Sequence, residues 1–211
     1  MTRAMIGPLA AIIIAATMPA SAQQAAAPRV PLVQDDSPDP DVQAGFKETR
    51  ARGTAPLNLH RIYANAPKIA RAMSATAQAL RNGAVVPRAD RELIILRATQ
   101  LAHGHYQHEE HRPIAMSCGI SEAQIDGLAH WRDGKLFDDR QRAVLAYADG
   151  MVSPEGVTDA TFDEMKRFFS AQEIVELTMN AAYYSGSSQI SRALGVTADG
   201  NPPKSGYGTC K

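Results

Sequence analysis

The sequence contains little cysteine, no net charge and no long apolar run beyond its first residues. Its 211 residues include 2 cysteines, and 22 basic residues balance 22 acidic ones. Without an excess of basic residues, bulk charge gives no reason to expect a nucleic-acid or anionic-membrane partner. No later apolar run approaches the length of about 20 residues that a membrane span requires. Binding specificity must therefore come from a pocket or a local patch.

The first 22 residues have the features of a secretory signal peptide. Arg3 supplies the positive start, residues 5–17 form an apolar run, and the small residues of 19–22 form a cleavage site. We expect cleavage after Ala22 and a periplasmic or secreted mature protein that no longer contacts the membrane. The alternative is an uncleaved N-terminal anchor.

The cysteines Cys118 and Cys210 do not form a Cys-x-x-Cys pair, so the sequence has no dithiol redox centre. An oxidising compartment permits a disulfide between them, provided that the fold brings their Cα atoms within reach. Such a bond would attach the Gly/Pro-rich tail, residues 198–211, to the rest of the protein.

No segment shows the alternating apolar pattern of a β-strand, and the sequence has no Gly-rich phosphate loop and no internal repeat. Residues 65–83 and 87–104 instead carry apolar side chains at three- to four-residue spacing. Capping signals predict later helix starts at Ser121, at Asp138 or Asp139, at Thr158 and at Ser170. The sequence predicts an all-α bundle of about six to eight helices.

One globular domain accounts for a composition that is 45% hydrophobic and 21% charged. We place this helical domain at residues 57–197. Residues 23–56 are rich in Pro, Asp, Gln and Ala, and their prolines interrupt regular structure. We predict that this segment is a linker or an arm that lies over a partner.

Residues 88–111 combine a nearly all-apolar helix with a run of histidines, which are His103, His105, His108 and His111. A helix with almost no polar stripe should be covered on most sides. This helix nevertheless contains Glu92 and Arg97. Burying an unpaired charge costs roughly several kcal/mol, so each of the two needs a partner or a ligand.

Residues 91–97 read Arg-Glu-Leu-Ile-Ile-Leu-Arg, and Tyr106, His111, Ala115 and Gly119 follow. This pattern resembles the carboxymuconolactone decarboxylase family, whose superfamily also contains AhpD-like alkylhydroperoxidases. The resemblance extends from about residue 57 to residue 196. It implies an AhpD-like helical fold, a homo-oligomer such as a dimer or a trimer of dimers, and an active pocket near a subunit interface.

The resemblance places Glu92 and His111 at the family's proton-relay acid and histidine, and Tyr106 at its motif tyrosine. Peroxidase relatives carry two cysteines at the positions of Gly104 and Gln107, and this sequence carries neither. Without a thiolate the usual peroxide-reducing nucleophile is missing, so an alkylhydroperoxidase or peroxiredoxin-type activity is the disfavoured alternative.

Decarboxylase relatives commonly carry glutamate at the position of Gln107 and tryptophan at that of His108. Because this sequence departs at both, the family's own lactone is a weak candidate for the substrate. Decarboxylation of such a lactone needs an oxyanion partner and a proton donor rather than a metal or redox cofactor. We therefore predict a carboxy-lyase-like, cofactor-independent activity on a small carboxylated or lactone-like molecule.

His111 can exchange a proton at neutral pH, and His108, three residues earlier, would share its face on a continuous helix. The predicted catalytic residues are His111, Glu92, Tyr106 and His108. Arg97 is the predicted anchor for a substrate carboxylate.

Each assignment has a structural alternative. His111 would be a hydrogen-bonded core or interface histidine, and Glu92 an intrahelical partner of Arg88. Arg97 would pair with Glu92 or with an acid on another helix, and Tyr106 would pack with one hydrogen bond. Aromatic residues outside the motif, Trp131, Tyr183 and Tyr184, are more often core or interface residues than walls of a pocket.

The histidines also allow a metal-binding alternative, with His105, His108 and His111 as ligands. Their spacing is neither His-Glu-x-x-His nor His-x-x-Glu-His, and it distributes the rings around a helix. A non-catalytic helical module is a further alternative, which a fully packed space around His111 would favour.

Overall fold

The computed structural model describes residues 27–199 and 210. Within these residues the regular structure consists of nine α-helices and one 3-10 helix, without a strand, which confirms the all-α prediction. No helix in this part of the chain is long and apolar enough to cross a membrane. The predicted signal peptide and most of the tail lie outside the described residues.

The helices follow the predicted starts closely. In chain order they are α1 (Pro40–Ala51), α2 (Asn58–Tyr63), α3 (Pro67–Asn82), α4 (Arg88–Leu101), α5 (His105–Ser117), α6 (Glu122–Asp126), the 3-10 helix η1 (Gly127–His130), α7 (Asp139–Val152), α8 (Asp159–Lys166) and α9 (Ala171–Leu194). The four predicted capping residues each accept a hydrogen bond from a backbone N–H of the first turn, and they are Ser121, Asp138, Thr158 and Ser170. Gly195, at φ 67°, ends α9 in the left-handed conformation that favours glycine.

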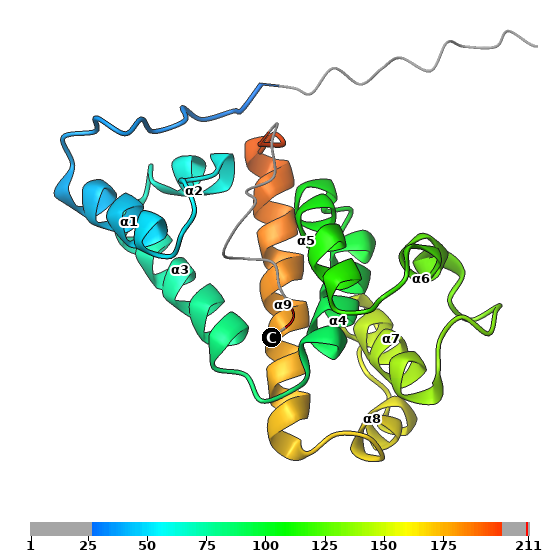
Figure 1. Ribbon diagram of the computed structural model, residues 1–211. Helices are drawn as coiled ribbons and strands as arrows, with labels where there is room; N and C mark the ends of the chain where they lie inside the picture. Colours follow the sequence, from blue (N-terminus) through cyan, green and yellow to red (C-terminus); the bar gives the residue numbers. More distant parts are fainter. Residues whose placement is uncertain (1–26, 200–209, 211) are drawn as a thin grey trace, which may run out of the picture.

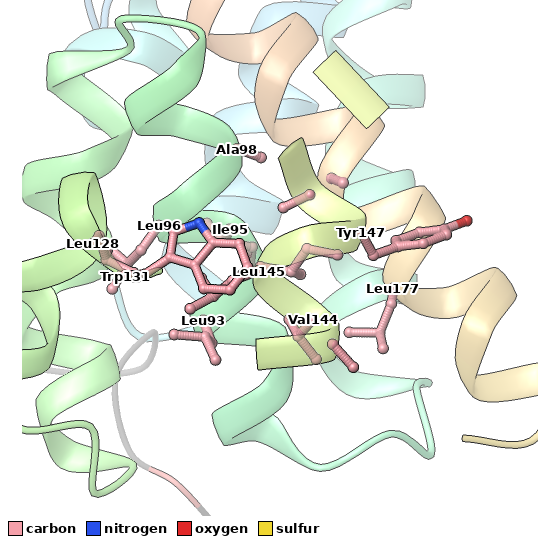
Figure 2. Close-up of a cluster of buried hydrophobic side chains, with 14 of the residues drawn as sticks. Leu93, Ile95, Leu96, Ala98, Leu128, Trp131, Val144, Leu145, Tyr147 and Leu177 are labelled. Carbon is pink, nitrogen blue, oxygen red and sulfur yellow. The ribbon is translucent and has the colours of Figure 1, made fainter. Parts of the chain in front are cut away.

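Helix α4 is the centre of the main core. Its residues 90–99 are all buried, and it packs against α5, α7 and α9. Figure 2 shows apolar side chains of α4, α7 and α9 in one cluster, with Trp131 and Leu128 at one end and Leu177 at the other. A helix that is buried on all sides depends on other elements to cover it, so α4 fixes the positions of its neighbours.

Helix α1 lies inside the segment that the sequence predicts to be a linker. Asp39 accepts hydrogen bonds from the backbone N–H groups of the first turn, and Pro40 begins the helix, where its missing N–H is no loss. Val42 and Phe46 then pack with Ala64 in a small second core. The prediction of irregular structure was wrong for residues 40–51, because Pro40 starts a helix rather than breaking one.

Helix α9 runs through the middle of the molecule, with α1–α3 on one side of it and α4, α5 and α7 on the other (Figure 1). Helix α3 contacts both α1 and α9. The N-terminal helices therefore form a separate wall that faces α9 and α5 rather than a further layer of the main core.

The two cysteines are joined by a disulfide. Cys118 follows the last residue of α5, and its Cα lies 5.0 Å from that of Cys210. Both cysteines of the chain are thus oxidised, and the end of the chain is attached to the end of α5.

The central position of α4 predicts a large effect of truncating its core. Leu96 is 0% exposed, whereas Leu136 is 49% exposed. We expect Leu96→Ala to lower the free energy of unfolding by about 2–5 kcal/mol, because it removes buried methyl groups and leaves a cavity. Leu136→Ala, the matched control, should lower it by less than about 1 kcal/mol. Urea denaturation measures both, and equal losses would contradict the central role of α4.

Candidate active site

Glu92 of α4 and His111 of α5 form a buried hydrogen bond. The Nδ1 atom of His111 lies 2.7 Å from the Oε2 atom of Glu92, and the two residues are 6% and 1% exposed. The Nε atom of Arg88 donates to the other carboxylate oxygen at 2.6 Å. The predicted contact with His111 and its alternative, the intrahelical pair with Arg88, are thus both present.

The surroundings of Glu92 determine its charge. Burial by itself raises the pKa of Glu92, but His111 and the Arg88 guanidinium overcome that effect and hold the pKa below its ordinary value. Glu92 is therefore a carboxylate at neutral pH and accepts the hydrogen bond from Nδ1–H of His111. The Nε2 atom is left as the ring nitrogen that can act on another molecule.

His111 lines a cavity of about 400 Å³. The wall on one side comes from α1, α2 and α3, and the wall on the other side comes from α5 and α9. Glu92 is not on the wall, because it lies on the far side of the His111 ring, towards α4. The apolar part of the wall includes Phe46, Leu57, Leu59, Met73, Ile114 and Tyr183.

An aromatic contact with α9 holds the His111 ring in place. The ring packs edge-on against Tyr184 with centroids 4.5 Å apart, and Tyr184 packs edge-on against Tyr183 at 5.1 Å. Both tyrosines line the cavity, so they are wall residues. Trp131 belongs to the main core instead, where its Nε1 donates to Asp149.

Tyr106 also lines the cavity, but its hydroxyl is engaged. It donates to Oδ2 of Asp199 at 2.7 Å, while Oδ1 of Asp199 accepts from the backbone N–H of Asn58 at 2.6 Å. Burial, and then the negative charge of Asp199, raise the pKa of Tyr106, which keeps the phenol protonated. The Tyr106 hydroxyl is therefore engaged within the protein, as the structural alternative has it, and it fixes Asp199 beside α2.

Arg97 does not line the cavity. Its Nε donates to Asp149 of α7 at 2.6 Å, and its Nη1 donates to the side chain of Gln100 and to the carbonyl of Leu128. The predicted substrate-anchoring role is not supported, because the guanidinium pairs with an acid on another helix. That structural alternative is what the structure shows.

His108 turns towards α4 rather than towards the cavity. Its Nδ1 lies 3.3 Å from the carbonyl oxygen of Leu96 and 3.4 Å from Oγ1 of Thr99. Burial lowers the pKa of His108 and favours the neutral ring. The catalytic assignment of His108 is therefore not supported, because its ring bonds to α4 and the residue does not line the cavity.

The metal-binding alternative has no ligand set in the described part of the chain, where no three His, Cys, Asp or Glu side chains are grouped to hold an ion. His111 directs Nδ1 to Glu92, His108 directs Nδ1 to α4, and His105 is exposed. The three rings therefore do not converge on one point.

The N-terminal wall supplies residues that the sequence analysis missed, including His60 and Tyr63 of α2. His60 accepts the backbone N–H of Leu57 at Nδ1, 3.0 Å away, and so caps its own helix. Burial, and then the charges of Arg52, Arg81 and Arg61, lower the pKa of His60 to about 4. No standard capping signal marks this helix start, because Leu57 has no side-chain acceptor and histidine is not one of the usual capping-box residues.

Comparisons with known proteins support the family resemblance. Residues 67–150, which include Glu92 and His111, match the model of the carboxymuconolactone decarboxylase family. The uncharacterized protein YnjA of Escherichia coli (strain K12) is 32% identical over 88 residues, 41% of this chain and 48% of that protein. The chain thus spans about half the length of this curated relative.

Two solved structures share the fold. An uncharacterized peroxidase-related protein from Ralstonia eutropha JMP134, described as an alkylhydroperoxidase AhpD core, is 20% identical with a TM-score of 0.69, over 81% of this chain and 92% of that one. An uncharacterized peroxidase-related protein from Silicibacter sp. TM1040 is 18% identical with a TM-score of 0.69, over 90% of this chain and 100% of that one. At these identities the likeness concerns the fold.

The neutral, buried state of His60 predicts a pH dependence of stability. Its folded-state pKa of about 4 lies below the ordinary 6.5, so its contribution is complete above pH 6.5 and is lost as the pH falls towards 4. We expect wild type to lose roughly 1–2 kcal/mol more unfolding free energy between pH 7 and pH 5 than His60→Asn, whose amide oxygen keeps the cap without titrating. Urea denaturation at both pH values tests this, and parallel losses would contradict it.

Proposed function

We propose that this chain is an enzyme that transfers a proton to or from a small carboxylated or lactone-like molecule in the cavity. Its likeness to the carboxymuconolactone decarboxylase and AhpD-like superfamily supports this proposal. The observation that carries this proposal is the hydrogen bond of 2.7 Å between Glu92 and His111, on a ring that lines a cavity of about 400 Å³. A buried carboxylate that orients an imidazole towards a ligand space is an arrangement suited to general acid–base catalysis.

The chemistry follows from the hydrogen bond. With Nδ1–H donated to Glu92, the neutral ring presents the lone pair of Nε2 and can accept a proton from a bound molecule. The imidazolium that forms is stabilised by the Glu92 carboxylate, and it can return the proton. A decarboxylation would start from the imidazolium form of His111 instead. The electron pair of the broken C–C bond would form a dienolate, carbon dioxide would leave, the imidazolium would protonate the carbon, and water would return a proton to the ring.

Arg81, rather than Arg97, is our candidate for binding a substrate carboxylate. Arg81 lines the cavity beside Tyr184, to which it is hydrogen-bonded, and so places positive charge on the wall. Arg71, also on the wall, is paired with Asp41 and Glu48. We propose that Arg81 attracts the carboxylate of a substrate, because charge at a partly desolvated wall acts more strongly than charge in water.

The alkylhydroperoxidase alternative requires a thiolate. Both cysteines of the chain are in the disulfide, and neither lines the cavity. A Cβ at Gly104, where peroxidase relatives carry a cysteine, would collide with the side chain of Ser188. These observations favour proton transfer over peroxide reduction.

The non-catalytic alternative would be favoured by a packed space around His111. The cavity beside the ring supports ligand binding instead. We further propose that the mature protein is secreted or periplasmic after cleavage at Ala22, since a disulfide persists in an oxidising compartment. A homo-oligomer, as the family resemblance implies, also remains a proposal.

The proposed function predicts that one histidine of α5 carries the activity. A screen of lactones, β-keto acids and small carboxylates should find turnover that His111→Gln lowers by about 100-fold or more, because glutamine cannot exchange a proton. His105→Gln, a matched change at an exposed histidine of the same helix, should leave kcat/KM within about twofold. Equal turnover by wild type and His111→Gln would refute the assignment.

A further inference from the structure

Gln107 carries a buried amide oxygen on the cavity wall. The residue is 3% exposed and lines the cavity, and its Oε1 atom is buried without a hydrogen-bond partner in the described part of the chain. The other amide atom, Nε2, donates to Oγ of Ser187 at 2.8 Å. A buried acceptor without a donor is unfavourable, so such atoms in folded proteins commonly have a functional reason.

We infer that Oε1 of Gln107 accepts a hydrogen bond from the ligand. The ligand class is then a small, largely apolar molecule that carries a hydroxyl or enol O–H close to the atom that exchanges a proton with His111. This inference rests on the proposed function and adds to it the feature by which the site selects its substrate.

The position of Gln107 supports this assignment. Gln107 and His111 are four residues apart on α5, so their side chains lie on one face, about one helical turn of roughly 5.4 Å apart. Each faces a residue of α9, because Gln107 bonds to Ser187 and His111 packs against Tyr184. The acceptor and the proton-exchanging ring are therefore held at a fixed separation by the same two helices.

The hydrogen bonds around Gln107 determine what it can recognise. Ser187 already bonds to Nε2 of Gln107 and lies 3.3 Å from the hydroxyl of Tyr63. With Nε2 engaged, the amide offers the ligand an acceptor. A carboxylate oxygen is itself an acceptor and cannot donate to Oε1. A ligand carboxylate is therefore expected to bind near Arg81, and a ligand hydroxyl is expected to donate to Gln107.

The rest of the wall favours an apolar body. The side chains of Phe46, Leu57, Leu59, Met73 and Ile114 line the same cavity. A ligand that fills this space leaves no room for water at the wall, so a donor for Oε1 must come from the ligand itself. The better the apolar part of the ligand fills the cavity, the more strongly the site should favour a ligand that carries a hydroxyl.

The test compares two probes that differ in one donor, para-ethylphenol and para-ethylanisole, by calorimetric titration of the full mature chain. We expect wild type to bind the phenol about tenfold more tightly or better, although the ether is the more apolar molecule. Gln107→Met should reduce the preference to about twofold or less. Gln107→Glu, which keeps an acceptor, should retain it, and Gln189→Met, a matched change at an exposed position of α9, should leave it unchanged.

Three results would overturn the inference. They are equal binding of the two probes by wild type, a preference that persists in Gln107→Met, and absence of measurable binding of the phenol. His111→Gln separates this inference from the proposed function, because it should lose turnover and keep the preference for the phenol. If His111→Gln keeps full turnover while the preference depends on Gln107, the proton-transfer proposal fails and the binding assignment stands.

Discussion

The carboxylate of Glu92 is a charge placed in the core of an all-helical protein, and the arrangement of α4 and α5 depends on how that charge is compensated. Removing an ion from water costs several kcal/mol or more in order of magnitude unless hydrogen bonds and opposite charge replace the solvent. Arg88 satisfies one oxygen from within α4, and His111 satisfies the other from α5. The contact that makes the burial of Glu92 tolerable is therefore also the contact that orients the imidazole.

The cavity exists because the chain has two unequal cores. The main core surrounds α4, whereas Val42, Phe46 and Ala64 form a small cluster between α1 and the end of α2. The N-terminal helices lie across α9 from the main core (Figure 1). Apolar and polar side chains of α5 and α9 thus face a second wall instead of a close-packed layer, and His111 reaches the space between them.

Local signals in the sequence predicted most of the fold and part of the site. Capping residues such as Ser170 specify helix starts from hydrogen bonds within one turn, and the apolar run of α4 requires burial whatever its neighbours are.

For the site, the contact between Glu92 and His111 was predicted from the family resemblance. The partner of Arg97 lies 52 residues away on α7, and the rotation of His108 depends on packing against α4, so neither follows from local pattern. Proline content concealed α1, although Asp39-Pro40 is itself a helix start.

The turn between α4 and α5 leaves little space for a thiol at the position where peroxidase relatives carry one of their cysteines. His103 adopts φ 51°, and the glycine that follows packs so closely on α9 that a Cβ would collide with Ser188. A cysteine at that position would require α9 to move, and the position three residues later holds the amide of Gln107, which is bonded to Ser187. The close approach that excludes a thiol from the turn also brings Ser187 and Tyr184 of α9 against α5. What remains beside the cavity is an imidazole oriented by a carboxylate and a neutral acceptor one turn away, which is consistent with the proton transfer that we propose.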